Sequence, residues 1–261
     1  MIAVAFMLGL RHGFDADHLA AIDGLARFNA TDRPSLAKRT GFWFSVGHGA
    51  IVMIVASSVC LLASTWAAPP WLEPFGAWVS ISVLTLLGVA NLAAAVQAPA
   101  GVKAVPVALR GGLFKRLLHA KGRWPIMGVG ALFAVSFDTF SQAALMAVTG
   151  TALQGLPVVI ALASAFVAGM ITTDGINGLW VARLLRRTDY TGVSASRIMC
   201  AGLGCVSLGT ALLGICNRVS PAFISWGEKH EAEFGWIIVS VTLASFLLAL
   251  AFASDKARCR S

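Results

Sequence analysis

Apolar residues occur along this chain in long runs that polar residues interrupt at regular intervals. Most runs extend over about 20 residues, the length that an α-helix needs to cross the hydrocarbon core of a bilayer, whereas a buried strand takes roughly 4–8. The pattern predicts about seven membrane-spanning helices, at about 1–26, 41–64, 77–97, 124–148, 157–181, 198–216 and 236–254. We therefore expect an all-α integral membrane protein, a polytopic helix bundle in which residues 1–261 form a single transmembrane domain.

The composition agrees with this interpretation. Hydrophobic residues make up 57% of the chain and charged residues 12%, with a mean hydropathy of +0.79. A soluble domain of this size carries about twice that share of charged residues to cover its surface. The composition therefore argues against the main alternative, a very apolar soluble α/β enzyme.

Basic residues concentrate in alternate loops between the predicted spans. Seventeen Lys and Arg residues lie after spans one, three and five or in the tail, against two, Arg218 and Lys229, in the other loops. The positive-inside rule then places the N-terminus outside and the C-terminus in the cytoplasm. The chain has no nucleic-acid-binding module, so we do not expect its net charge of +8 to serve a nucleic acid. The long loop at 99–123 is cationic enough to lie on anionic membrane lipid.

The first span contains the densest polar cluster, the stretch RHGFDADH at residues 11–18. Charged side chains are costly at bilayer depth, so such a cluster indicates function. On one continuous helix, His12, Asp15 and His18 share one side, while Asp17 points elsewhere and is available to Arg11. Two imidazoles and a carboxylate suit a divalent cation such as Ni²⁺, Co²⁺ or Zn²⁺.

Other spans contribute further polar candidates. His48 lies between two glycines that permit close helix approach, and we expect it to complete the metal site across the helix pair. Six residues are expected to line the route or support the ligands: Asp17, Asn91, Asp138, Thr139, Asp174 and Asn177. A structural role for the aspartates, and hydrogen bonding within the helix for Thr139, remain the alternatives.

Four patches in this order resemble the nickel/cobalt transporter (NiCoT) family of permeases. The RHGFDADH stretch is similar to the family's most diagnostic motif, and VGH at 46–48 to its second. The stretches 137–142 and 169–178 match its third and fourth motifs in part. The resemblance implies high-affinity uptake of Ni²⁺ or Co²⁺, with the His and Asp residues of the first motif handling the metal.

The chain departs from the family pattern in three places. Family members usually have eight spans, one of them ahead of the first motif, and only ten residues precede Arg11 here. The third motif ends in Gln142 rather than Glu. The fourth motif has Asn177 in place of its second Asp, with Gly175 and Ile176 at its Thr positions. Two acids have become amides, which leaves the preferred metal open.

The expected function is that of a multi-pass nickel and/or cobalt uptake permease of the cell inner membrane. We expect no enzyme activity and no cofactor, the metal ion being the transported substrate. No GxxxxGK[ST] loop is present, so the chain has no predicted ATP site. The alternatives are a metal exporter, a carrier that uses the cluster for protons, or an intramembrane metal-dependent hydrolase. The hydrolase would favour an HExxH motif, which this sequence lacks.

Overall fold

The computed structural model describes residues 1–30, 32–62, 71–99, 122–134, 137–153, 155–186 and 190–220, together with residues 240 and 244. Every regular element in this part of the chain is an α-helix, as predicted. In chain order these are α1 (Ile2–His12), α2 (Ala16–Ala30), α3 (Pro34–Ala37), α4 (Thr40–Leu62), α5 (Leu72–Gln97), α7 (Trp124–Phe133), α8 (Phe137–Leu153), α9 (Leu156–Arg186) and α10 (Tyr190–Val219).

Four of the described helices are long and apolar enough to cross a membrane. Their candidate spans are Thr40–Leu62, Pro74–Gln97, Leu156–Arg183 and Ser196–Val219. They correspond to the second, third, fifth and sixth predicted spans. The seventh prediction, 236–254, falls outside the described residues except at 240 and 244.

The first predicted span is two helices rather than one. α1 ends at His12 and α2 begins at Ala16, so the prediction of a continuous helix over 1–26 was wrong. The amides of Phe14 and Asp15 bond the carbonyls three residues back, those of Arg11 and His12, and this tightens the chain into a turn. The Leu10 carbonyl instead accepts a bond from the Thr173 hydroxyl of α9, at 3.0 Å. A contact with another helix thus supplies the hydrogen bond for a carbonyl near the end of α1. The hydrophobic pattern of the sequence does not show that a helix ends here.

The fourth predicted span, 124–148, is also divided. It forms α7 and α8, and residues 135 and 136 between them lie outside the described part of the chain. α7 has ten residues, and an α-helix of that length spans about 15 Å, half the thickness of the hydrocarbon core. The prediction of one continuous helix was wrong here too, because a run of apolar residues does not reveal a change of helix direction.

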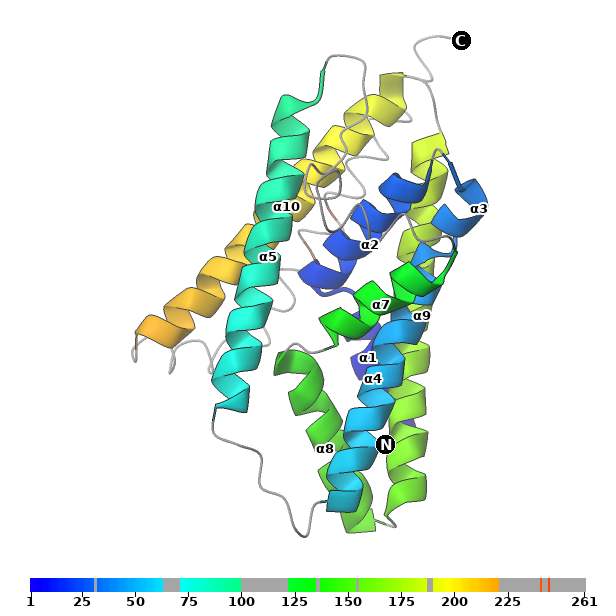
Figure 1. Cartoon of the computed structure of the whole chain (residues 1–261), viewed down its shortest axis with the longest axis vertical. Helices are drawn as coiled ribbons and strands as arrows, with labels where there is room; N and C mark the ends of the chain where they lie inside the picture. Colours follow the sequence, from blue (N-terminus) through cyan, green and yellow to red (C-terminus); the bar gives the residue numbers. More distant parts are fainter. Residues whose placement is uncertain are drawn as a thin grey trace.

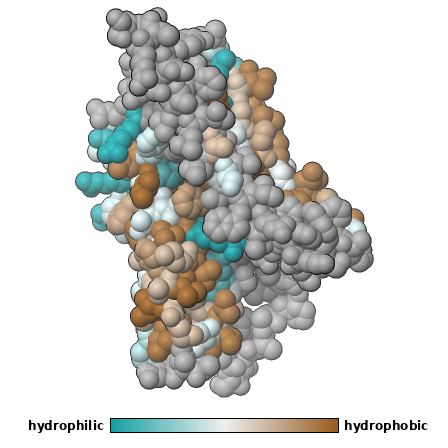
Figure 2. Space-filling view, turned by 180° about the vertical axis from the view of Figure 1, so that it is seen from behind, coloured by the Kyte–Doolittle hydropathy of each residue, from teal (hydrophilic) through white to brown (hydrophobic). Residues whose placement is uncertain are grey.

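The helices pack around α4 and α9. α1 and α2 lie against α9, α7 and α8 lie against α4, and α5 pairs with α10 (Figure 1). Figure 1 shows α4 and α10 running down the view and α5 and α9 running up it. Seen from behind in Figure 2, apolar residues cover most of the described surface in the lower half. Large exposed apolar residues of α1 and α4, such as Met7, Ile54 and Leu61, fit a surface in contact with lipid.

Glycines allow these helices to approach until their backbones touch. A Cβ atom at Gly41 of α4 would lie 1.8 Å from the Asp174 carbonyl oxygen of α9. A Cβ atom at Gly47 would lie 2.0 Å from the Met127 carbonyl oxygen of α7. Small residues at helix crossings permit this close packing in membrane proteins. The two contacts place α4, which carries His48, directly between α7 and α9.

Candidate metal site

Three histidines from three helices meet in the interior of the molecule. His12 is the last residue of α1, His18 lies in the first turn of α2, and His48 lies on α4. All three are buried, with 2%, 0% and 0% of their surface exposed. Each can offer one nitrogen to a group whose members all lie within 4.8 Å of one another. This arrangement can hold a metal ion.

The break between α1 and α2 brings His12 and His18 together. On a continuous helix, residues six apart are separated by about 9 Å along the axis and about 120° around it. In the structure their ring centroids lie 4.6 Å apart, and each ring lies about as close to His48, at 5.2 Å and 4.7 Å. The predicted grouping of the two histidines on one side of a regular helix was therefore wrong in its geometry.

Two of the imidazole nitrogens already have the spacing of metal ligands. The Nε2 atoms of His12 and His48 lie 3.3 Å apart. Nitrogens bound to one ion at about 2.1 Å lie about 3.0–3.4 Å apart in octahedral or tetrahedral geometry. The distance also fits a hydrogen bond between the two imidazoles.

Asp174 orients the ring of His18. Its Oδ2 atom lies 3.1 Å from His18 Nδ1 and accepts a hydrogen bond of 2.7 Å from the Ser45 hydroxyl of α4. His18 Nε2 is buried and has no hydrogen-bond partner among the described residues. A carboxylate on one nitrogen fixes the tautomer and leaves the other nitrogen to bind metal, which is the usual outer-shell arrangement of metal-bound histidine.

Asp15 and Asp17 contact two of the three histidines at different groups, Asp15 at a side chain and Asp17 at a backbone amide. Asp15 Oδ2 lies 2.8 Å from His12 Nδ1, and its side chain is 35% exposed. It lies beside Nδ1 of His12, whereas Nε2 of that ring faces His48, and its role as a ligand stays a prediction. Asp17 Oδ1 accepts a bond from the His18 amide in the first turn of α2, where an acid also favours the helix dipole. Asp17 therefore supports the restart of the helix.

Two of the three histidines have a carboxylate beside them. Two carboxylates, Asp174 and Asp15, contact histidines directly. Asp174 is fully buried, and its Oδ1 atom has no hydrogen-bond partner in the described part of the chain. Buried charge is costly unless it is compensated. With neutral imidazoles, a bound dication would balance the two carboxylates.

Two of the remaining predicted residues, Asn91 and Asn177, are buried on α5 and α9 and are not members of the three-histidine group. Asn91 is buried on α5 and donates to the Leu87 carbonyl of its own helix. Asn177 is buried on α9, one turn beyond Asp174, and its Nδ2 atom has no partner among the described residues. The side chains of Asp138 and Thr139 are outside the described part of the structure, so their predicted roles stay predictions.

A buried ion pair on α2 was not predicted. Arg27 donates from Nε and Nη2 to the two carboxylate oxygens of Asp23, at 2.6 Å and 2.9 Å, and also to the Ser196 hydroxyl of α10. The charge pattern places Arg27 among the basic residues after the first predicted span, whereas it lies within α2 and is 4% exposed. The spacing of Asp23 and Arg27, four residues apart on one helix, was the signal that could have identified the pair.

Comparison with known proteins gives a consistent result. The model of a family described as high-affinity nickel-transport protein matches residues 1–194. The nickel transporter NicT of Mycobacterium tuberculosis is 33% identical over 94% of this chain and 76% of its own length. The high-affinity nickel transport protein of Cupriavidus necator is 31% identical over 95% of this chain and 81% of its own.

A third relative is named for a different metal. The cobalt transport protein NhlF of Rhodococcus rhodochrous is 32% identical over 69% of this chain and 62% of its own length. No solved structure matches the chain. The family model covers more than half of the chain and includes all three histidines. The chain therefore belongs to the family of high-affinity nickel-transport proteins.

Proposed function

We propose that this protein is an uptake permease for Ni²⁺, Co²⁺ or both, and that His12, His18 and His48 bind the ion in transit. The observation that carries the proposal is the convergence of three buried imidazoles from three helices. Imidazole nitrogen suits both metals. The relatives named for nickel and for cobalt support this substrate class.

The route to the site begins at Asp15 in this proposal. Asp15 is the partly exposed group that contacts a buried histidine, so an ion arriving from water meets it first. The ion then exchanges its remaining waters for imidazole nitrogens. His12 ends α1, and the C-terminal end of a half-helix favours a cation. Discontinuous helices commonly form the ion sites of transporters for this reason.

The membrane potential is a sufficient driving force for accumulation. A charge crossing 100 mV changes its free energy by about 2.3 kcal/mol, so a dication gains about 4.6 kcal/mol. This corresponds to an accumulation of roughly a thousandfold. If the membrane potential supplies this free energy, inward transport needs no nucleotide. Proton coupling through the histidines is the competing mechanism.

Accumulation of radioactive ⁶³Ni²⁺ and ⁵⁷Co²⁺ in cells that express the chain tests both the substrate and the direction. Uptake above that of cells with an empty vector is expected for at least one metal. Substitution His48→Ala, and separately His12→Ala, should reduce uptake to the vector background, because each removes one of three ligands. Lower accumulation than in vector cells would instead indicate an exporter.

A control variant separates loss of the site from loss of the folded protein. Thr85→Val removes an exposed hydroxyl of α5 that bonds only to its own helix, at the Ile81 carbonyl, and should leave uptake unchanged. The amount of each variant in the membrane is measured by immunoblot. Full uptake by His48→Ala at normal abundance would exclude the three-histidine site as the transport site.

A further inference from the structure

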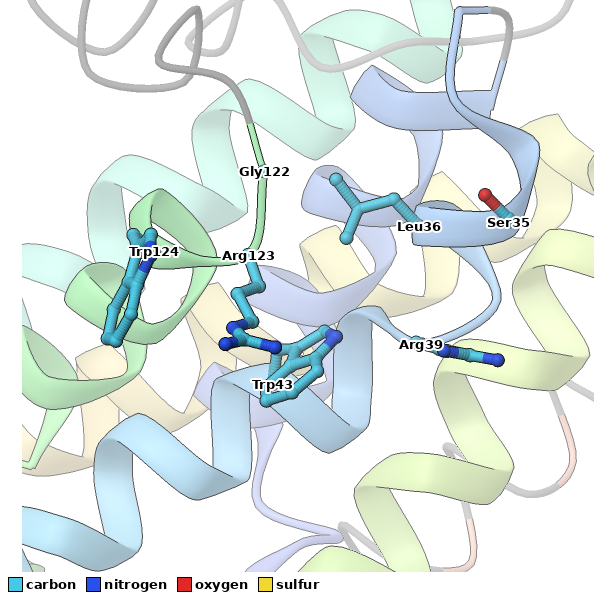
Figure 3. Close-up of a pocket in the computed structure, with 7 residues that line it drawn as sticks. All are labelled: Ser35, Leu36, Arg39, Trp43, Gly122, Arg123 and Trp124. Carbon is cyan, nitrogen blue, oxygen red and sulfur yellow. The ribbon is translucent and has the colours of Figure 1, made fainter.

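A basic and aromatic pocket lies away from the three histidines, where α3 leads into α4 and beside the start of α7. Its volume is about 390 Å³. Figure 3 shows the Arg123 side chain lying over Trp43, whereas Arg39 points away from both. The lining residues include Ser35, Leu36, Arg39, Trp43, Arg123 and Trp124.

The pocket carries positive charge that the described residues do not neutralise. The Arg123 guanidinium lies over the Trp43 ring, 4.8 Å from its centroid, and 5.4 Å from the centroid of Trp124. Neither Arg39 nor Arg123 forms an ion pair within the described part of the chain, and both are exposed. Stacking on indole holds a guanidinium in place and leaves its N–H donors available.

The start of α7 adds to this positive potential. α7 begins at Trp124, directly after Arg123, and its N-cap residue, Arg123, makes no side-chain capping bond. The first-turn amides of a helix attract anions when they are not capped. The arginines and the start of α7 therefore favour the same kind of ligand.

The pocket also lies at one end of a candidate membrane span. It is located at the start of α4, one of the helices long and apolar enough to cross the bilayer. Tryptophan settles at the headgroup level, and Trp43 and Trp124 both line the pocket. Three large apolar residues of α4 and α7, Trp124, Leu132 and Phe42, are 67%, 60% and 41% exposed. An acyl chain would contact these residues.

We propose that this pocket binds the phosphodiester headgroup of an anionic phospholipid. The phosphate would accept hydrogen bonds from Arg123 and, after rotation of its flexible side chain, from Arg39. The acyl chains would follow the exposed apolar residues of α4 and α7. A soluble anion would use the arginines but not this apolar surface, which is why we assign the pocket to a lipid. The assignment does not depend on the proposed transport of metal.

Binding of short-chain lipid to the purified full-length protein in a neutral detergent tests the assignment. Dioctanoyl phosphatidylglycerol should raise the melting temperature and bind in native mass spectra, and dioctanoyl phosphatidylcholine should bind at least tenfold more weakly. The variant Arg39→Gln/Arg123→Gln should bind phosphatidylglycerol at least tenfold more weakly than the wild type. If the double variant does not fold, Arg123→Gln alone should weaken binding about threefold.

The matched control removes two positive charges from the same region without touching the pocket. Arg33 and Lys38 flank α3 and do not line the cavity, so Arg33→Gln/Lys38→Gln should retain full binding. Equal loss in this control would show attraction to general surface charge and overturn the proposal. Unchanged binding by Arg39→Gln/Arg123→Gln would also overturn it. Displacement of the lipid by inorganic phosphate at equal concentration would assign the pocket to a free anion instead.

Discussion

At the scale of single residues, the arrangement around His18 shows how one imidazole nitrogen is left available for a ligand. His18 is fully buried, and Asp174 and Ser45 determine which of its nitrogens stays available. His12 Nδ1 also lies near a carboxylate, that of Asp15, but this side chain is 35% exposed. The two histidines therefore differ in how strongly a carboxylate can influence them, because water screens charge and competes for hydrogen bonds.

This difference predicts a graded effect of removing each carboxylate. Asp174→Asn should weaken Ni²⁺ binding by about 10–100-fold, the usual cost of losing an outer-shell partner of a metal-bound histidine. Asp15→Asn, at a site that is 35% exposed, should cost clearly less. Calorimetric titration of Ni²⁺ into the purified variants measures both. Equal losses, or a larger loss in Asp15→Asn, would contradict the assignment of Asp174 as the main positioning residue.

At the scale of elements, the site depends on how closely the helices approach one another. α4 supplies His48 and Ser45, α9 supplies Asp174, and the two helices touch through backbone at Gly41. The Thr173 hydroxyl bonds α9 to the carbonyl of Leu10 near the end of α1. A small shift between α4 and α9 therefore disturbs several contacts of the site together.

Two glycine substitutions in α4 and α9 should differ in their effect on stability and uptake. Gly41→Ala places a Cβ atom 1.8 Å from a backbone oxygen that cannot move aside, so α4 and α9 must separate. Overpacking of this kind costs about 1–3 kcal/mol, and a lower melting temperature and reduced ⁶³Ni²⁺ uptake are expected. Gly175→Ala is the control, because its Cβ atom would meet nothing within 4 Å. Normal stability and uptake in Gly41→Ala would show that the close approach is unimportant.

At the scale of the whole molecule, the described helices alternate in direction in a way that suits the charge pattern. α4 and α10 run opposite to α5 and α9 (Figure 1). The end of α5, the end of α9 and the start of α4 then lie on one side, as the distribution of Lys and Arg predicts. Arg27 is buried in an ion pair, so it no longer counts among the basic residues on the cytoplasmic side. The predicted orientation stays the same without it.

Fusions to alkaline phosphatase, which is active only outside the cytoplasm, test this orientation. A fusion after Leu62, at the end of α4, should be active, and a fusion after Arg186, at the end of α9, should be inactive. The reason is that the basic residues near the second position are retained in the cytoplasm. The opposite pattern would mean that the predicted orientation of both termini is wrong.

The sequence by itself determined that this protein belongs in a membrane, that it is helical and which family it resembles. Apolar runs of bilayer length and the scarcity of charge leave no other stable arrangement for such a chain. The motif RHGFDADH marked the site region because charged and imidazole groups are costly inside a membrane. His48 was also predicted to belong to the metal site, because it is a histidine within an apolar span.

Only the tertiary structure decided how the site is assembled. Hydropathy averages over a span, so it cannot reveal that residues 13–15 turn the chain or that 124–148 is two helices. The distances among the three rings follow from that turn and from the approach of α4, and both depend on contacts between residues far apart in the sequence. The same is true of Asp174, which was recognisable as an intramembrane acid. Its bond to His18 exists because α9 packs against α2, which carries that histidine.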